Sequence, residues 1–313
     1  MGEKKSYLFG PVPSRRLGLS LGVDVVPYKV CSFDCVYCQV GASTEKTCQR
    51  KEYILVDEVL AELKSRLDKG LGADYITLSG SGEPTLNSRV NELIAGIKGL
   101  TDIPVAVLTN GSLLFDKDVR AALYEADVVL PNLDAGSERV FRKINRPCKD
   151  ITLEKLVKGL CDFREEFGGE IWLEVFIIDG INTDKEELKK IKGLIAKIKP
   201  DKVQLNTAVR PTTEKGIKGA DKSLMERIAK FIGGGCEVVA DFGKVKVNRH
   251  IRATEQQLLS MLKRRPCSLD DICNGLGLHR NEATKYTTEL QKNGLIQTEN
   301  RGSKVFYKAK QDR

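Results

Sequence analysis

Between residues 21 and 207, short apolar runs rich in β-branched residues alternate with longer segments whose apolar positions recur at helical spacing. The short runs are apolar on both faces, which is typical of buried parallel strands, and the longer segments predict amphipathic helices. Six strands are expected, at 21–27, 75–80, 104–111, 127–134, 171–178 and 202–207. Helices are expected between them, at 56–70, 88–99, 116–124, 152–166 and 184–198.

This alternation predicts an α/β fold in which helices cover a parallel sheet. A closed (β/α)8 barrel needs two more units, and none is visible before the pattern changes. We therefore expect a partial (β/α)6 TIM-like barrel over residues 1–211. In such a barrel, the loops at the carboxyl ends of the strands build the site.

The pattern changes after residue 211. Residues 212–250 are expected to extend the barrel and connect it onward, with turn-forming residues, a helix, three glycines and a short strand. Residues 251–313 predict a helix, a short helix, a longer helix and a hairpin that turns at 300–303. This order is typical of a winged helix–turn–helix domain.

Composition narrows the class of protein only a little. The chain has 313 residues, is 41% hydrophobic and carries a formal charge of +8. Residues 251–313 hold 12 lysines and arginines against 7 acidic residues, so five of these charges lie there. No run approaches the roughly 20 apolar residues that span a bilayer. The segment "SRRLGLSLGVDVV" reads as a loop entering a strand rather than an export signal, so we expect a cytoplasmic protein.

Three cysteines lie close together in "CSFDCVYC", at Cys31, Cys35 and Cys38. Thiolates favour zinc and iron–sulfur clusters. Structural zinc needs four ligands, and Cys48 is the fourth candidate, since both histidines are far away in the sequence. A [4Fe–4S] cluster held by three cysteines keeps one iron open to another ligand. The remaining cysteines read as small buried hydrophobic residues: Cys148, Cys161, Cys236, Cys267 and Cys273.

The segment "CSFDCVYC" resembles the cluster motif of the radical S-adenosylmethionine (SAM) superfamily, including its aromatic residue, here Tyr37. The resemblance implies a [4Fe–4S] cluster on Cys31, Cys35 and Cys38 whose open iron binds SAM. It also implies a partial barrel, and a reductant such as flavodoxin or ferredoxin. Reductive cleavage of SAM would give a 5′-deoxyadenosyl radical.

The segment "GSGEP" after the second predicted strand resembles the family's Gly-Gly-Glu-Pro, with Ser81 replacing the first glycine. The resemblance implies that this edge, including Gly80, Gly82 and Glu83, receives the amino group of SAM. The alternative is an ordinary turn, since glycines at a strand end also make turns.

Polar residues also follow the third and fourth predicted strands, Asn110 in "VLTNG" and Asn132 and Asp134 in "LPNLD". Similar family segments contact the ribose and carboxylate of SAM, while the alternative is helix capping. Weaker candidates are Glu174, Asn182, Asn206 and Arg210, with Arg15 and Arg16 either near the barrel mouth or solvated. No catalytic residue is assigned.

Three further segments resemble a subgroup placed with the wyosine-base synthases of transfer RNA: "GPVPSRRLG", "NLDAGSERVFRKINRP" and "QLNTAVRP". This favours a radical SAM enzyme acting on an RNA-like macromolecule. Arg280, Lys285 and Lys304 would then contact RNA or DNA phosphates, unless the C-terminal domain holds a protein or packs on the barrel. The alternative function is a regulator that senses redox state or SAM through the cluster and binds a DNA operator.

Overall fold

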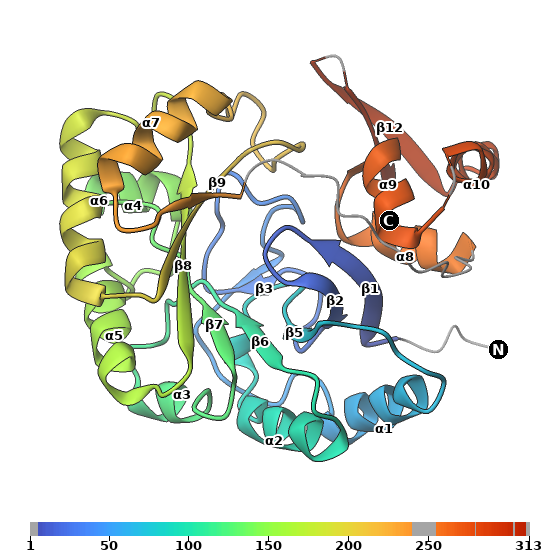
Figure 1. Ribbon diagram of the computed structural model, residues 1–313, viewed down its shortest axis with the longest axis horizontal. Coiled ribbons are helices and arrows are strands. Elements are labelled where there is room, and N and C mark those ends of the chain that lie inside the picture. The colour runs from blue at the N-terminus through green and yellow to red at the C-terminus, as the bar shows by residue number, and fades with distance from the viewer. Residues whose placement is uncertain (1–5, 240–254, 279, 303, 311–313) are drawn as a thin grey trace.

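A computed structural model describes residues 6–239, 255–278, 280–302 and 304–310. Its centre is one curved sheet in the order β1-β2-β5-β6-β7-β8-β9-β10 (Figure 1). The strands are β1 (Leu8–Ser14), β2 (Gly18–Val23), β5 (Tyr75–Leu78), β6 (Val105–Leu108), β7 (Val128–Leu130), β8 (Glu170–Ile177), β9 (Lys202–Thr207) and β10 (Glu237–Val238). All neighbours pair in parallel except β1, which is antiparallel to β2.

Helices cover the outer face of this sheet (Figure 1). They are α1 (Val56–Leu67), α2 (Val90–Leu100), α3 (Lys117–Ala121), α4 (Glu138–Asn145), α5 (Leu153–Glu166), α6 (Lys185–Ile198) and α7 (Lys222–Ile232), with a 3-10 turn, η1 (Pro84–Leu86). Each long helix buries one apolar stripe against the strands, as Leu93, Ile94 and Ile97 of α2 do. The result is an α/β fold with a mostly parallel sheet, consistent with the expected partial barrel.

The six predicted strands correspond to β2, β5, β6, β7, β8 and β9, and the five predicted helices to α1, α2, α3, α5 and α6. The first strand was placed too late, because it spans Gly18–Val23 rather than 21–27. Two elements, β1 and α4, are not predicted by the apolar pattern of the sequence. Prolines in β1 hide its strand pattern, and an edge strand tolerates them because one side needs no hydrogen-bond donors.

The C-terminal elements form a second hydrophobic cluster, which includes Leu258, Leu262, Ile272 and Leu290. They are α8 (Glu255–Arg264), β11 (Cys267–Ser268), α9 (Leu269–Leu276), α10 (Arg280–Lys292), β12 (Ile296–Arg301) and β13 (Lys304–Ala309). The strands make an antiparallel sheet in the order β11-β13-β12. The predicted boundary at 250/251 lies outside the described residues.

The C-terminal elements pack on the barrel through α8 and α9, which contact β1 (Figure 1). Arg210, which follows β9, forms a buried ion pair with Asp271 of α9, with 3.1 Å between Nη2 and Oδ1. Arg301 of β12 donates to the carbonyl oxygen of Ile217 at 3.0 Å. Among the described residues, no helix is long and apolar enough to cross a membrane.

Candidate active site

Cys31 is the last residue of β3 (Val30–Cys31), which pairs with β4 (Glu45–Lys46), and the loop that follows carries Cys35 and Cys38. Phe33 anchors it in the core, edge-on to Phe141 with ring centroids 5.5 Å apart. The backbone N–H of Val36 donates to the carbonyl oxygen of Ile144 at 2.9 Å. On the other side, the N–H of Thr213 donates to the carbonyl oxygen of Cys38 at 2.9 Å. Backbone contacts from two directions therefore fix the loop before any ligand binds.

The three thiols line one cavity of about 220 Å³, which we call the cysteine cavity. Each sulfur has a nitrogen donor close to it. Lys29 Nζ lies 3.1 Å from Cys38 Sγ, Asn110 Nδ2 lies 3.6 Å from Cys31 Sγ, and Asn145 Nδ2 lies 3.5 Å from Cys35 Sγ. Donors of this kind stabilise negative charge on sulfur.

Among the residues that the structure describes, no three His, Cys, Asp or Glu side chains converge to hold a single metal ion. The thiols instead surround a volume. Burial, followed by the nearby Glu83 carboxylate, raises the pKa of Cys31 to about 12. Burial, with Asp134 next in importance, also raises the pKa of Cys35 well above its usual range. The thiolate forms here therefore depend on a positively charged partner, which iron would supply.

Glu83 lies on the wall of this cavity, but its carboxylate is already fully hydrogen-bonded. Oε1 accepts from the hydroxyl of Thr109 at 2.6 Å, and from the hydroxyl and N–H of Thr85 at 2.5 and 3.0 Å. Oε2 accepts from the N–H of Asn110 at 2.7 Å. Burial raises the pKa of Glu83, and these bonds oppose that rise. The side chain thus ties the end of β5 to the end of β6 and positions Asn110.

The two glycines of "GSGE" allow the chain to pass close to its neighbours. Gly80 has φ of +112°, and a Cβ there would lie 1.9 Å from Asp24 Oδ1. A Cβ on Gly82 would lie 1.9 Å from the carbonyl oxygen of Val30. Ser81 does not line the cavity, since its N–H and hydroxyl both donate to Asp24 Oδ1, at 2.9 and 3.1 Å. The hydroxyl of Ser81 therefore bonds to Asp24 and not to a group in the cysteine cavity.

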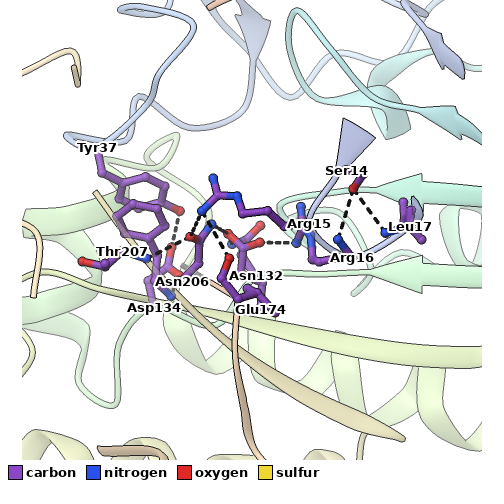
Figure 2. Close-up of polar contacts among 12 residues, drawn as sticks. Ser14, Arg15, Arg16, Leu17, Tyr37, Asn132, Asp134, Glu174, Asn206 and Thr207 are labelled. Carbon is purple, nitrogen blue, oxygen red and sulfur yellow. Dashed lines mark hydrogen bonds and ion pairs between the residues drawn. The ribbon is translucent and has the colours of Figure 1, made fainter. Parts of the chain in front are cut away.

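Tyr37 forms part of the cavity wall and is held in two ways. Its ring stacks on Phe176 with centroids 3.8 Å apart, and its hydroxyl donates to Asp134 Oδ2 at 2.5 Å (Figure 2). Asp134 also accepts from Asn145 Nδ2 at 2.6 Å and from the N–H of Phe176 at 2.9 Å. Burial raises the pKa of Asp134 to about 6. Asp134 therefore does not line the cavity, and it positions Tyr37, which does.

A polar network continues from Asn132 across the ends of β8 and β9 (Figure 2). Glu174 forms an ion pair with Arg16, and its Oε1 accepts from Asn132 Nδ2 at 3.3 Å and from Asn206 Nδ2 at 3.4 Å. Arg15 Nη1 donates to Asn206 Oδ1 at 3.1 Å. Both arginines that precede β2 therefore reach the barrel interior. The sequence alone allowed two positions for them, near the barrel mouth or in solvent.

A second cavity of about 340 Å³ adjoins the first, and we call it the arginine cavity. It shares Arg16, Tyr37, Cys38 and Glu174 with the cysteine cavity. The far wall consists of Met261, Arg264 and Arg265, from α8 and the residue after it. The C-terminal elements therefore help to enclose the space beside the cysteines.

Most of the predicted site residues come together. Cys31, Cys35, Cys38, Tyr37, Gly80, Gly82, Glu83, Asn110 and Asn132 line the cysteine cavity, whereas Ser81 and Asp134 do not. Asn182 has no exposed surface and donates to the carbonyl oxygens of Asp134 and Phe176. Sequence reasoning missed Lys29, Asn145 and Arg265. Lys29 lies two residues before Cys31, and Asn145 lies in the segment "NLDAGSERVFRKINRP", but neither stands at a motif position that indicates a contact with sulfur. Arg265 reaches the site only through the packing of α8 on β1.

Known proteins match this chain in sequence and in fold. The sequence model of the Radical SAM superfamily matches residues 25–191. A UPF0026 protein of Methanocaldococcus jannaschii is 34% identical over 308 residues, covering 96% of this chain and 94% of its own length. A "GTPase Obg" of Brachyspira hyodysenteriae is 41% identical over 300 residues, 95% of this chain, which spans only 44% of that relative.

The fold likeness is more distant. A solved structure of TYW1 with a lysine-pyruvate adduct bound superposes with a TM-score of 0.53 at 19% identity, covering 72% of this chain and 75% of that one. At this identity the likeness shows the fold alone. These matches support neither the predicted grouping with the wyosine-base synthases nor the alternative function as a DNA-binding regulator.

Proposed function

The chain belongs to the radical SAM superfamily and groups with its UPF0026 proteins, and we propose on this basis that it cleaves SAM reductively at a [4Fe–4S] cluster in the cysteine cavity. It is an iron–sulfur radical SAM enzyme. The observation that carries the proposal is the cavity itself, where three thiols face one volume and no fourth cysteine joins them among the described residues.

The residues present fit such a cluster. Cys31, Cys35 and Cys38 would hold it, and Lys29 with Asn110 and Asn145 would donate to the sulfurs. When bound, the cluster and SAM together supply a 5′-deoxyadenosyl radical. The backbone of Gly80 and Gly82, with Asn110 and Asn132, offers donors and acceptors for SAM on the same cavity wall.

The chain's other residues shape the space in which the substrate is held. Tyr37, held by Asp134 and Phe176, forms a rigid wall shared by the two cavities. Glu83 fixes Asn110, and Glu174 fixes Arg16 and Asn132. Preorganised groups of this kind orient bound molecules without rearrangement during the reaction.

The test is production of 5′-deoxyadenosine. Anaerobic, cluster-loaded protein reduced by dithionite or a flavodoxin should convert SAM to methionine and 5′-deoxyadenosine, measured by chromatography. The Cys35→Ala protein should form none. Cluster-loaded protein that binds SAM and never cleaves it would contradict the proposal.

We further propose that the chain divides into a barrel (1–211), a connector (212–250) and a winged helix–turn–helix (251–313). The order of α8, β11, α9, α10, β12 and β13 supports the last assignment. Lys285 and Lys304 are exposed and suit phosphate contacts, while Arg280 pairs with Asp270. These features favour an RNA-like substrate.

RNA binding is tested by the salt dependence of affinity. Transfer RNA should bind more weakly as salt rises, and the Lys285→Ala/Lys304→Ala protein should show a shallower slope. Duplex DNA of random sequence is the competitor in the same buffer. Preference for the duplex, or binding that ignores both lysines, would contradict the RNA assignment.

A further inference from the structure

Two cysteines that line neither cavity contact each other. Cys48 and Cys148 are half-buried, carry free thiols and are hydrogen-bonded to each other through their side chains. Neither belongs to the walls of the cysteine cavity or the arginine cavity. The proposed cluster therefore leaves these two thiols, which we call the cysteine pair, without a function.

Backbone hydrogen bonds hold both cysteines close to the segment that carries the proposed cluster ligands. The N–H of Thr47, directly before Cys48, donates to the carbonyl oxygen of Cys31 at 3.0 Å. The N–H of Cys148 donates to the carbonyl oxygen of Ser32 at 2.9 Å. Two distant segments of the chain are thus bonded to consecutive carbonyl groups. The two sulfurs are held together before any reaction, which favours a bond between them.

Several cationic groups lie near the cysteine pair. Lys46 Nζ donates to the carbonyl oxygen of Arg146 at 3.3 Å, a contact between residues 100 positions apart. Arg142 Nη1 donates to the carbonyl oxygen of Cys148 at 3.5 Å, and the next residue, Lys149, is exposed. Reactive cysteines occur in partly exposed, electropositive surroundings because the nucleophile is the thiolate. The same charges attract small disulfides that carry carboxylates, as glutathione disulfide does.

The two thiols have different parts in their shared hydrogen bond. Burial, followed by the bond with Cys148, raises the pKa of Cys48 to about 12, and the charge of Asp150 adds to the rise. Cys48 therefore keeps its proton and donates it to the sulfur of Cys148, which stabilises negative charge there. Thiol–disulfide exchange begins with attack by a thiolate. This assigns Cys148 as the attacking thiol and Cys48 as the thiol that reacts second.

We propose that the cysteine pair is a redox-active site that small disulfides of the glutathione class oxidise to a protein disulfide. The Cys148 thiolate attacks one sulfur of the small disulfide, whose S–S bond breaks, so that a mixed disulfide forms and one small thiolate leaves. Cys48 then attacks the Cys148 sulfur and displaces the second small thiolate. The protons of the two protein thiols pass to the two small thiols. Two protein thiols are oxidised and one small disulfide is reduced.

The oxidised pair would link two distant segments covalently beside β3. A disulfide that closes a long loop stabilises a protein mainly by restricting its unfolded chain. Where thiols are otherwise kept reduced, such disulfides are usually transient and sense redox state. The cysteine pair would therefore respond to oxidising conditions next to the segment that carries the cluster ligands. This inference goes beyond the proposed function and rests on no step of it, because SAM takes no part.

The experiment maps disulfides in the full-length, cluster-loaded protein. The protein is equilibrated without oxygen in buffers of increasing glutathione disulfide to glutathione ratio, alkylated, digested with trypsin and analysed by mass spectrometry. Cys48 and Cys148 fall in the peptides "TCQR" and "INRPCK", and all three cluster ligands fall in "VCSFDCVYCQVGASTEK". We expect the first two peptides to become linked while the visible absorbance of the cluster is retained. Cys161, which is also half-buried, is the internal control and should stay reduced.

Single variants test the order of attack. The Cys48→Ser protein should accumulate a glutathione mixed disulfide on Cys148, because the second thiol is missing. The Cys148→Ser protein should be modified at Cys48 about tenfold more slowly, because the remaining thiol keeps its proton. Cys161→Ser is the matched control and should form the link as the wild type does. The oxidised wild-type protein should also melt several degrees higher than the reduced protein, and neither pair variant should show this rise.

Three results overturn the proposal, and the first two need no variant. One is a wild-type protein whose two peptides stay unlinked at every glutathione ratio. Another is oxidation of Cys161, or of the cluster-ligand peptide, at the same ratio as the cysteine pair, because the reaction would then be unselective. The third is a Cys148→Ser protein modified as fast as Cys48→Ser, which overturns the assigned roles. A linked pair in protein that never cleaves SAM leaves this inference standing and rejects only the proposed function.

Discussion

Arg264, in the last turn of α8, forms an ion pair with Asp24, the residue directly after β2. The same carboxylate accepts the N–H and hydroxyl of Ser81, in the "GSGE" segment. Contacts between residues 240 positions apart thus join the C-terminal elements to the wall of the proposed SAM site. The serine that departs from the family's glycine is one of the residues that hold Asp24 in place.

The first prediction concerns this ion pair. Asp24→Asn leaves the Arg264 charge largely buried without a counter-ion, so the free energy of unfolding should fall by about 3 kcal/mol. Thermal and denaturant unfolding measure the loss. Glu186→Gln, which removes an exposed pair with Lys189, is the control and should cost less than about 1 kcal/mol. Equal losses for the two variants would show that the pair does not anchor the C-terminal elements.

The second prediction distinguishes the three cysteines of the cysteine cavity from Cys48 by their effect on the cluster. Alanine at Cys31, Cys35 or Cys38 should prevent assembly of a four-iron cluster, measured by iron and sulfide content and by visible absorbance. Cys48→Ser should keep the cluster. Cys48 does not line the cysteine cavity, and burial, followed by a hydrogen bond with Cys148, raises its pKa to about 12. Loss of the cluster in the Cys48→Ser protein would contradict the assignment. A protein that binds stoichiometric zinc instead of the cluster would also contradict it.

The third prediction concerns Lys29, whose ammonium lies 3.1 Å from Cys38 Sγ. Lys29→Met removes a positive charge next to a ligand sulfur, so the cluster's reduction potential should fall by on the order of tens of mV. A redox titration followed by electron paramagnetic resonance gives the shift. Lys29→Arg should restore most of it, and Lys64→Met, on the exposed face of α1, should cause none. An unchanged potential in Lys29→Met would remove Lys29 from the cluster environment.

The fourth prediction uses pH. Hydrogen bonds from Arg120 and then from Tyr124 lower the pKa of Glu166 to about 2, below its ordinary value of 4.5. A carboxylate with a lowered folded pKa stabilises the fold above its unfolded pKa and loses that effect as pH falls through the folded one. Glu166→Gln should therefore cost about 1 kcal/mol at pH 7 and nearly nothing at pH 2. Melting temperatures of both proteins across this range check it, and a pH-independent difference would contradict it.

The sequence by itself determined the parts of this protein that local patterns encode. Apolar runs such as "YITL" and "VAVL" form buried parallel strands because every residue in them avoids water on one face or the other. The spacing of Cys31, Cys35 and Cys38 places three thiols in one loop whatever the rest of the chain does. The polar residues at strand ends meet because parallel strands end at the same edge of the sheet.

Tertiary structure decided which of those polar residues remain available at the site. Asp134 and Asn110 both follow a predicted strand and were equivalent candidates in the sequence. In the structure Asp134 is buried, and its oxygens accept hydrogen bonds from Tyr37, Asn145 and Phe176. Asn110 instead faces the thiols. The arginine cavity exists only because α8 packs against β1 and brings Arg265 to Arg15. Contacts between segments so far apart in the chain follow from the burial of two surfaces, and no periodicity within either segment records them.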